Sequence, residues 1–226
     1  MPIVISLVIP TLNAAAVLPG CLEAAMPAGG RGLVRQIIVV DGGSSDGTVV
    51  AAEAKGATVS TALGGRGPQL ALGCKASTQP WLLALHADTR LAAGWEEAAL
   101  LHMREQPERA GWFSLRFDER SLPADLWAVG VGVRSRLGLP YGDQGLLISR
   151  ALYDRIGGYR ALPLMEDVDI VRRLGRARLW RIAAEAVTDA SKYRRDGWLR
   201  RSARNWSLVA RYLAGADPHR LALDYD

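Results

Sequence analysis

The sequence has few cysteines and no long apolar run, and both shortages narrow the classes of protein to which it can belong. Cys21 and Cys74 are the only cysteines among 226 residues, and they form neither a CxxC pair nor a disulfide framework. This excludes a disulfide-stapled scaffold, and we expect two free thiols in a reducing cytoplasm. No segment offers the roughly 18 uninterrupted apolar residues that a membrane-spanning helix needs.

The first 22 residues contain no charged side chain, so a signal peptide has to be considered. The basic n-region of a signal peptide is missing, because the first basic residue is Arg31. Pro10, Asn13, Pro19 and Gly20 also interrupt the apolar run. We therefore expect a cytoplasmic protein.

Charge is unevenly distributed along the chain. Hydrophobic residues make up 49% and charged residues 23%, which is typical of a soluble globular protein and excludes a disordered chain or a coiled coil. Residues 1–171 contain 15 Lys+Arg and 17 Asp+Glu, whereas residues 172–226 contain 13 and 6. The basic tail predicts an anionic partner near the C-terminus, such as a membrane surface, nucleic acid or phosphate.

Strand and helix patterns alternate in the first half of the chain. Short β-branched or apolar runs predict strands, and the segments between them predict helices. The strands are expected at Val4–Pro10, Gln36–Asp41, Ala57–Thr61 and Trp81–His86, and the helices at Ala14–Ala25, Thr48–Lys55 and Pro68–Ala76. This alternation predicts a Rossmann-like α/β fold with a mostly parallel central sheet flanked by helices.

The second half is less regular, and no Pro/Gly/Ser linker separates it from the first. Strands are expected at Ala110–Phe117 and Gly145–Ser149, and helices at Leu122–Arg136 and Glu166–Arg176. We therefore predict a single domain over residues 1–226. Ligands of such sheets bind beyond the carboxyl ends of the strands, so the polar residues there are the first candidates for a site.

Two polar segments follow the first two predicted strands. PTLN (Pro10–Asn13) follows the first strand, and DGGSSDGT (Asp41–Thr48) follows the second. Asp41 stands where an acid could accept hydrogen bonds from a nucleoside base or ribose. Glycines allow close approach to the backbone, while Ser44 can cap the next helix, so a plain turn explains this segment equally well. A GxGxxG fingerprint is absent, which disfavours a dinucleotide cofactor.

Acidic residues recur at two later positions. HADT, with His86 and Asp88, follows the fourth strand, and a carboxylate there could be balanced by a divalent cation on a diphosphate. A helix cap or loop hydrogen bond is the alternative role of Asp88. Glu166, Asp167 and Asp169 open a predicted helix, where acids are stabilised by the helix dipole. Three acids exceed the need of one cap, so one of them could serve as a general base.

Together these segments resemble family 2 glycosyltransferases of the GT-A fold. The matching segments are VISLVIPTLN, IIVVDGGSSDGT, GRGPQLALG, LLALHADT, GDQGLLISRALYDRIGGY and MEDVDIVRRL, which run from Val4 to Leu174. The HADT and GRGPQ variants are similar to a bacterial subgroup labelled arsenosugar-biosynthesis-like glycosyltransferases.

The resemblance implies roles for individual residues. Asp167 would be the catalytic base with Glu166 beside it, and Asp88 would hold Mg²⁺ or Mn²⁺ on the diphosphate. The residues implied to bind the nucleotide sugar are Pro10, Thr11, Asn13, Asp41, Ser44, Arg66, Gln69, His86 and Asp88. By the same resemblance, residues 1–90 would bind the nucleotide, 91–190 the acceptor, and 191–226 would form a basic helical tail. The implied reaction moves one sugar to an acceptor hydroxyl with inversion.

The chain departs from the family pattern at three points. His86 replaces the first acid of the Asp-x-Asp motif, and Ala14 stands where many members have Glu. The Gln-x-x-Arg-Trp motif of processive polysaccharide synthases is absent, as are their membrane spans. We therefore expect a single sugar transfer rather than polymerisation.

The basic tail contains one strongly periodic segment, Trp198–Leu213. At 100° per residue one face carries Leu199, Ala203, Trp206, Val209, Ala210 and Leu213, and the other Arg200, Arg204 and Arg211 with Arg201 beside them. Such a helix fits an in-plane contact with an anionic membrane, which would make the protein peripheral at the inner face of the membrane. A helix packed on its own domain with a solvated basic face is the alternative. One residue of Lys192–Arg195 could also clamp the donor diphosphate.

Two other functions stay open at this stage. A sugar-phosphate nucleotidyltransferase would need a basic Gly-rich loop after the first strand, and PTLNAAAV contains no basic residue. A non-catalytic membrane-surface protein on the same fold would not need Asp88 or Asp167. The expected partners are a UDP- or GDP-sugar and an unidentified acceptor. Nucleic acid is not expected, because the basic helix carries few aromatics and no recognised module.

Overall fold

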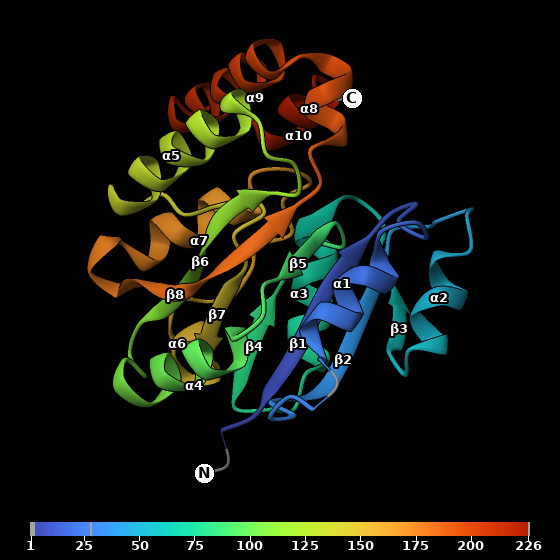
Figure 1. Ribbon diagram of the computed structural model, residues 1–226. Helices are drawn as coiled ribbons and strands as arrows, with labels where there is room; N and C mark the ends of the chain where they lie inside the picture. The colour runs from blue at the N-terminus through green and yellow to red at the C-terminus, as the bar shows by residue number, and fades with distance from the viewer. Residues whose placement is uncertain (1–2, 28, 226) are drawn as a thin grey trace.

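A computed structural model describes residues 3–27 and 29–225, which contain one eight-stranded sheet with helices on both faces (Figure 1). The strands are β1 (Ile5–Thr11), β2 (Val34–Asp41), β3 (Thr58–Thr61), β4 (Trp81–Ala84), β5 (Thr89–Leu91), β6 (Ala110–Phe117), β7 (Leu146–Ser149) and β8 (Leu179–Thr188). The helices are α1 (Leu18–Ala25), α2 (Thr48–Ala54), α3 (Arg66–Ala76), α4 (Trp95–Glu105), α5 (Leu122–Arg136), α6 (Arg150–Arg155), α7 (Glu166–Leu174), α8 (Ser191–Asp196), α9 (Trp198–Leu213) and α10 (Pro218–Leu223), with a 3₁₀ turn η1 (Arg176–Arg178). The predicted α/β fold is confirmed.

The strands cross the sheet in the order β3-β2-β1-β4-β7-β6-β8-β5. β3, β2, β1 and β4 pair in parallel, as the alternating pattern predicted. Every residue of β1 is buried, as expected for a strand that is covered on both faces. The four predicted strands form with ends displaced by one or two residues; β4, for example, ends at Ala84 rather than at His86.

The first helix is shorter than predicted, because it begins at Leu18 rather than at Ala14. Its first turn contains Pro19, whose fixed φ suits that position. The N–H groups of Ala14 and Ala15 instead bind side chains at the start of α2, at 2.8 Å from Thr48 Oγ1 and 3.0 Å from Asp46 Oδ2.

The second half of the sheet mixes directions. β7 is antiparallel to β4 and β6, β6 is parallel to β8, and β5 is antiparallel to β8. The sequence analysis predicted β6 and β7 but missed β8. Arg181 and Glu185 interrupt the apolar pattern of β8, and its first half is largely exposed. The three-residue β5 is too short to show a pattern of its own.

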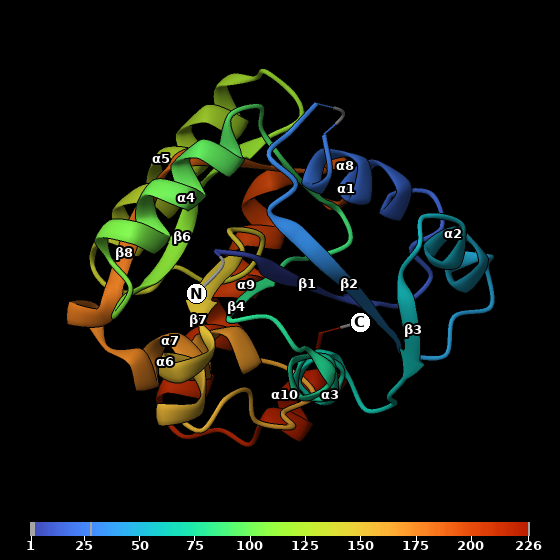
Figure 2. The same ribbon diagram turned by 90° about the horizontal axis from the view of Figure 1, so that it is seen from below.

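Two helical layers enclose the sheet (Figure 2). On one face α1, α2 and α4 bury Leu22, Ala52 and Trp95 against the inner residues of the strands. On the other face α3, α6 and α7 contribute Leu70, Leu152 and other apolar side chains. The sheet therefore has a packed core on both faces, and its strand ends are held by rigid neighbours.

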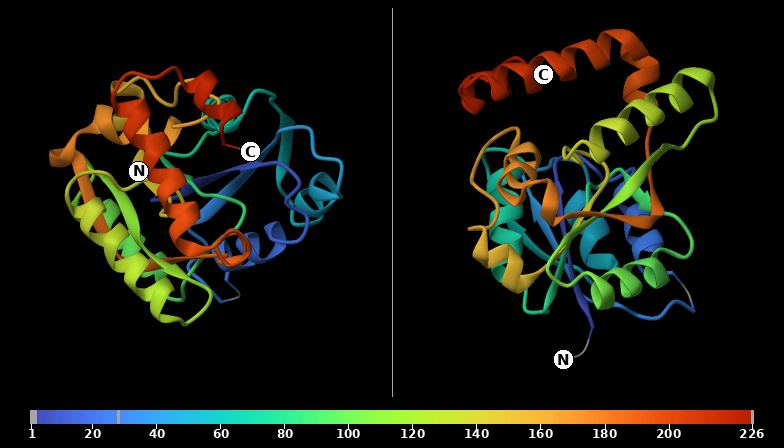
Figure 3. Two further views of the ribbon diagram at one scale, coloured as in Figure 1. Left: turned by 90° about the horizontal axis from the view of Figure 1, so that it is seen from above. Right: turned by 90° about the vertical axis from the view of Figure 1, so that its left-hand side faces the viewer.

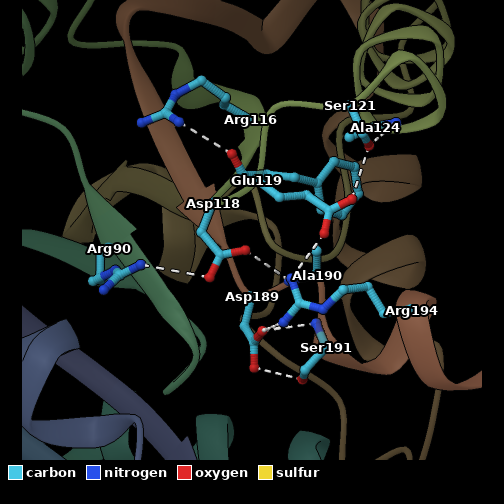
Figure 4. Close-up of polar contacts among 11 residues, drawn as sticks. Arg90, Arg116, Asp118, Glu119, Ser121, Ala124, Asp189, Ala190, Ser191 and Arg194 are labelled. Atoms are coloured by element: carbon cyan, nitrogen blue, oxygen red, sulfur yellow. Dashed lines mark hydrogen bonds and ion pairs between the residues drawn. The ribbon is translucent and has the colours of Figure 1, made fainter.

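Four further helices, α5, α8, α9 and α10, form a helical cover beyond the carboxyl ends of the parallel strands (Figures 1 and 3). The cover has two parts, because α5 follows β6 in the chain and α8, α9 and α10 follow β8. Both parts leave the sheet at the adjoining ends of β6 and β8. Figure 4 shows how they are tied together: Asp118 Oδ1 accepts a hydrogen bond from the Ala190 N–H at 3.1 Å, and Arg194 pairs with Glu119 at 2.8 Å. Ser121 caps α5 by accepting from the N–H of Ala124.

Both cysteines are buried free thiols, as predicted. Burial raises the pKa of the Cys74 thiol to about 12, so it stays protonated and is a poor nucleophile at neutral pH. In the part of the chain that the structure describes, no helix has the length and apolar character to cross a bilayer.

Candidate functional site

The ends of β1 and β2 bring together a network of predicted nucleotide-binding residues. Asp41 is its centre, with Oδ1 accepting from Thr11 Oγ1 at 3.0 Å and from Ser44 Oγ at 2.6 Å. Oδ2 of Asp41 accepts from the N–H groups of Gly43 at 2.9 Å and Ser44 at 2.7 Å. Gln69 on α3 donates to the Thr11 carbonyl at 2.8 Å.

The Asp41 carboxylate is held ionised by this network. Burial alone would raise its pKa, but the hydrogen bonds from Ser44, Gly43 and Thr11 outweigh burial, and the pKa lies below its ordinary value. Asn13 adopts a left-handed backbone with φ of 49° and accepts from the Ser45 N–H at 3.0 Å. Pro10 is buried in β1 beside Val40. The network fixes the loop that follows β2.

The three acids at the start of α7 differ in burial and in ion pairs, although ligand atoms of Glu166, Asp167 and His86 lie within 4.8 Å of one another. Glu166 is completely buried and pairs with Arg66 Nε at 2.8 Å. Burial raises the pKa of Glu166 above its ordinary value, although the charge of Arg66 opposes this effect. Asp169 pairs with Arg160 at 3.1 Å and Arg173 at 2.7 Å. Of the three acids, only Asp167 lines the pocket described below.

A second cluster lies at the end of β4. His86 Nδ1 lies 2.8 Å from Asp143 Oδ1, and single ligand atoms of His86, Asp88 and Asp143 all lie within 4.8 Å of one another. Burial and the charge of Arg66 would lower the pKa of His86, but the hydrogen bond and charge of Asp143 prevail and raise it. One imidazole nitrogen and two carboxylates are donors that suit Mn²⁺ or Mg²⁺. These residues therefore fit a divalent cation.

Asp143 is a site residue that the sequence analysis did not identify. Its segment, GDQG, takes part in the family resemblance, but the resemblance implies no role for Asp143. Gly142 and Gly145 have positive φ values of 79° and 62°, which allow the tight loop that presents Asp143. The buried Gln144 fixes this loop by donating to the Phe113 carbonyl at 3.1 Å and accepting from Ser135 at 2.9 Å.

The pocket lies between the strand ends and the helical cover. Predicted residues that line it are Arg66, His86, Asp88 and Asp167, and the cover contributes Trp127, Arg134, Tyr193, Arg201, Asn205 and Trp206 among others. Arg201 is buried and pairs with Asp196 at 2.6 Å. Arg194 and Arg195 pair with Glu119 and Asp196 and do not line the pocket, so Arg201 is better placed than either to meet an anionic ligand.

The structure thus divides the predicted residues into two groups. Pro10, Thr11, Asn13, Asp41, Ser44 and Gln69 form the network beside the pocket without lining it, and Glu166 lies behind Arg66. Arginines and acids from distant segments face one another across the pocket. This arrangement is typical of α/β enzymes that bind ligands beyond the strand ends.

The comparison with known families agrees with this arrangement. The model of glycosyl transferase family 2 matches residues 6–161, more than half of the chain. The chain therefore belongs to glycosyl transferase family 2. The match ends before Glu166 and Asp167, so it does not by itself test their roles. No curated protein gives a significant match.

Solved structures share the fold at low identity. Glucosyl-3-phosphoglycerate synthase from Mycobacterium tuberculosis, crystallised with Mn²⁺, UDP and glucosyl-3-phosphoglycerate, is 20% identical with a TM-score of 0.55 over 82% of this chain and 70% of that chain. TarS from S. aureus is 15% identical with a TM-score of 0.64, over 98% and 43%. Mannosyl-3-phosphoglycerate synthase from Rubrobacter xylanophilus is 19% identical with a TM-score of 0.62, over 94% and 75%. These likenesses concern the fold.

Proposed function

We propose that this glycosyltransferase moves one sugar from a nucleoside-diphosphate sugar, a UDP- or GDP-sugar, to an acceptor hydroxyl with inversion. The observation that carries the proposal is the position of Asp167, which faces one pocket together with Arg66 and the His86–Asp88–Asp143 cluster. Family membership favours sugar transfer over the two alternatives, a nucleotidyltransferase and a non-catalytic binding protein. The arsenosugar-like subgroup stays part of the proposal, without a named substrate.

The proposed roles of the individual residues follow from the charges around the pocket. Asp167 accepts the proton of the acceptor hydroxyl as that oxygen attacks the anomeric carbon. Arg66 and Arg201 face the side on which the diphosphate leaves, where their guanidinium groups stabilise its growing negative charge. Glu166 is a positioning residue, because its ion pair holds Arg66 in place.

His86, Asp88 and Asp143 would hold a divalent cation, Mg²⁺ or Mn²⁺. When bound, such an ion neutralises charge on the diphosphate. A structural neighbour was crystallised with Mn²⁺ and UDP-glucose, which supports this choice of cation and donor. The nucleoside is proposed to lie against the loop that Asp41 fixes.

Three further expectations remain proposals. Residues 1–90 would handle the nucleotide, 91–190 the acceptor, and 191–226 would cover the site. The buried thiols fit a reducing cytoplasm. The exposed Arg200 and Arg211 support a contact between α9 and an anionic membrane at the inner face.

A thermal-shift panel tests the donor and the cation. The protein is heated with UDP-, GDP- and CDP-sugars, each with and without Mn²⁺. A donor at 100 times its Kd should stabilise the native state by about 2.7 kcal/mol, and the shift should require the cation. Absence of a shift with every nucleotide sugar would count against the proposal.

Variants then test the cation ligands. Asp88→Asn and Asp143→Ala should each weaken Mn²⁺ binding roughly 10-fold or more, measured by the loss of the free-ion signal in electron paramagnetic resonance. Asp154→Asn, an exposed acid on α6, is the matched control and should leave Mn²⁺ binding unchanged. Equal binding by all three variants would place the cation elsewhere.

A further inference from the structure

Helix α5 turns an apolar stripe toward solvent. Its exposed apolar side chains recur at helical spacing and are 51–79% exposed: Leu122, Leu126, Val129, Val133 and Leu137, the last just past the helix end. At 3.6 residues per turn these five positions fall within an arc of about 80°. A surface helix normally buries such a stripe, and α5 instead buries Ala124, Val131 and Ser135.

Helix α9 has a second exposed apolar stripe. Leu199 is 85% exposed, Trp206 47% and Leu213 42%, with the exposed Ala203 and Ala210 between them. This is the apolar face that the sequence analysis identified, except that Val209 is buried. The helix packs on the domain through a different face, which contains Arg201, Ser202, Leu208 and Val209. Most of the apolar face is therefore turned toward solvent.

The two helices lie side by side at the same end of the molecule (Figures 1 and 3). An aromatic cluster joins them, since Trp127 of α5 and Trp198 of α9 pack around Phe117 with Tyr193. Both helices line the pocket, and Trp206 belongs to the pocket lining as well as to the α9 stripe. The other stripe residues lie on the outer faces of helices whose inner faces line the proposed site.

Charge favours an anionic partner for this surface. Residues 191–213 contain seven Lys+Arg and one acid. Arg136 is exposed beside the α5 stripe, and Arg200 and Arg211 are exposed on the basic face of α9, where Arg211 also pairs with Asp224 at 2.7 Å. A symmetric dimer through this surface would bring the same arginines together, because each copy presents an identical patch. An anionic bilayer instead offers apolar depth for Leu and Val, an interface suited to Trp, and phosphates for Arg.

We infer that the exposed faces of α5 and α9 together dock on the surface of an anionic lipid bilayer. The inference extends the proposed contact of α9 in two ways: α5 supplies half of the surface, and apolar insertion as well as charge holds the protein there. Docking does not depend on sugar transfer, although its use in catalysis rests on the proposed function.

Liposome flotation of the full chain tests the inference. Vesicles of phosphatidylcholine alone are compared with vesicles containing 30% phosphatidylglycerol, at low and high salt. We expect binding to the anionic vesicles, with a part that survives high salt because apolar insertion is not screened. The double variant Leu126→Gln/Val133→Gln should bind the anionic vesicles roughly 10-fold more weakly at both salt concentrations.

The control is Leu101→Gln, which changes an exposed apolar residue of α4 on another part of the molecule and should bind like the wild type. The melting temperature of each variant should differ from that of the wild type by no more than is usual for a surface substitution. Unchanged flotation of the double variant, or equal recovery with both vesicle types, would overturn the inference. So would a dimer in light scattering that the double variant abolishes. Because nucleotide-sugar binding is measured separately, failure of docking and failure of the proposed function are distinguishable.

Discussion

The two sides of the pocket are built in different ways. On the sheet side, polar side chains near the ends of the strands are fixed by several hydrogen bonds each, as Asp41 and Gln144 are. On the cover side, α5 and α9 touch the domain with mixed faces and leave apolar side chains exposed. In the proposed function the sheet side carries the chemistry, and in the further inference the cover makes the contact with a membrane. The effects of substitutions on the two sides should therefore differ in size and even in sign.

The largest effect is expected for Asp167→Asn on the sheet side. Loss of the general base should lower kcat roughly 10²- to 10⁴-fold, because the amide cannot accept the acceptor proton. Donor affinity should change little, so a KM-against-kcat comparison checks the assignment. If the variant retains the wild-type kcat, another residue is the general base.

Gly67→Ala should give the next largest effect. A Cβ at Gly67 would lie 2.2 Å from the Leu162 carbonyl oxygen and 2.6 Å from that of Arg160, and backbone cannot move aside cheaply. We expect a loss of about 2–3 kcal/mol in the free energy of unfolding, measured by urea denaturation. An unchanged free energy of unfolding would show that the backbone around Gly67 adjusts more easily than its packing indicates.

Asp41→Asn should cost about 1–2 kcal/mol of stability at neutral pH, because an amide cannot accept all the hydrogen bonds that the carboxylate receives. The folded pKa of Asp41 is depressed, so its contribution is present above the unfolded pKa of about 3.9 and is lost as pH falls through the folded value. The difference in the free energy of unfolding between wild type and variant should therefore be smaller at acidic pH. Urea titrations at pH 7 and pH 3 measure both differences, and a constant difference would contradict the ionised state of Asp41.

The smallest effect, of opposite sign, is expected on the cover side for Gly130→Ala. Gly130 lies inside α5, and a Cβ there meets no atom within 4 Å. Alanine should stabilise the helix by about 0.5–1 kcal/mol. This corresponds to a rise in Tm of about 1–4 °C by calorimetry. A fall in Tm would mean that α5 packs more closely than its exposure suggests.

The sequence was most informative where neighbouring residues determine the structure. Buried runs such as Ile5–Thr11 predict their own strands, and acids that directly follow a strand or open a helix, such as Asp88 and Asp167, could be found from their place in the chain. The partner of His86 could not, because Asp143 lies 57 residues away and reaches it only through the tertiary fold.

The faces of α9 show a second limit. Helical periodicity located the apolar stripe correctly, but it carries no information about which face meets the domain. Packing against the start of α7 and against α10 buries Leu208 and Val209, Arg201 is buried as well, and Leu199 stays in solvent. β8 could not be predicted, because exposed charged side chains interrupt the apolar pattern of this ten-residue strand.

The place of β5 has a consequence for synthesis of the protein. This strand follows β4 directly in the chain, yet it pairs only with β8 at the far edge of the sheet. During translation, residues 89–91 must wait until residues 186–188 have left the ribosome before they find their partner. The first half therefore cannot complete its own sheet as it emerges, and a late step of sheet assembly joins two segments that lie far apart in the chain.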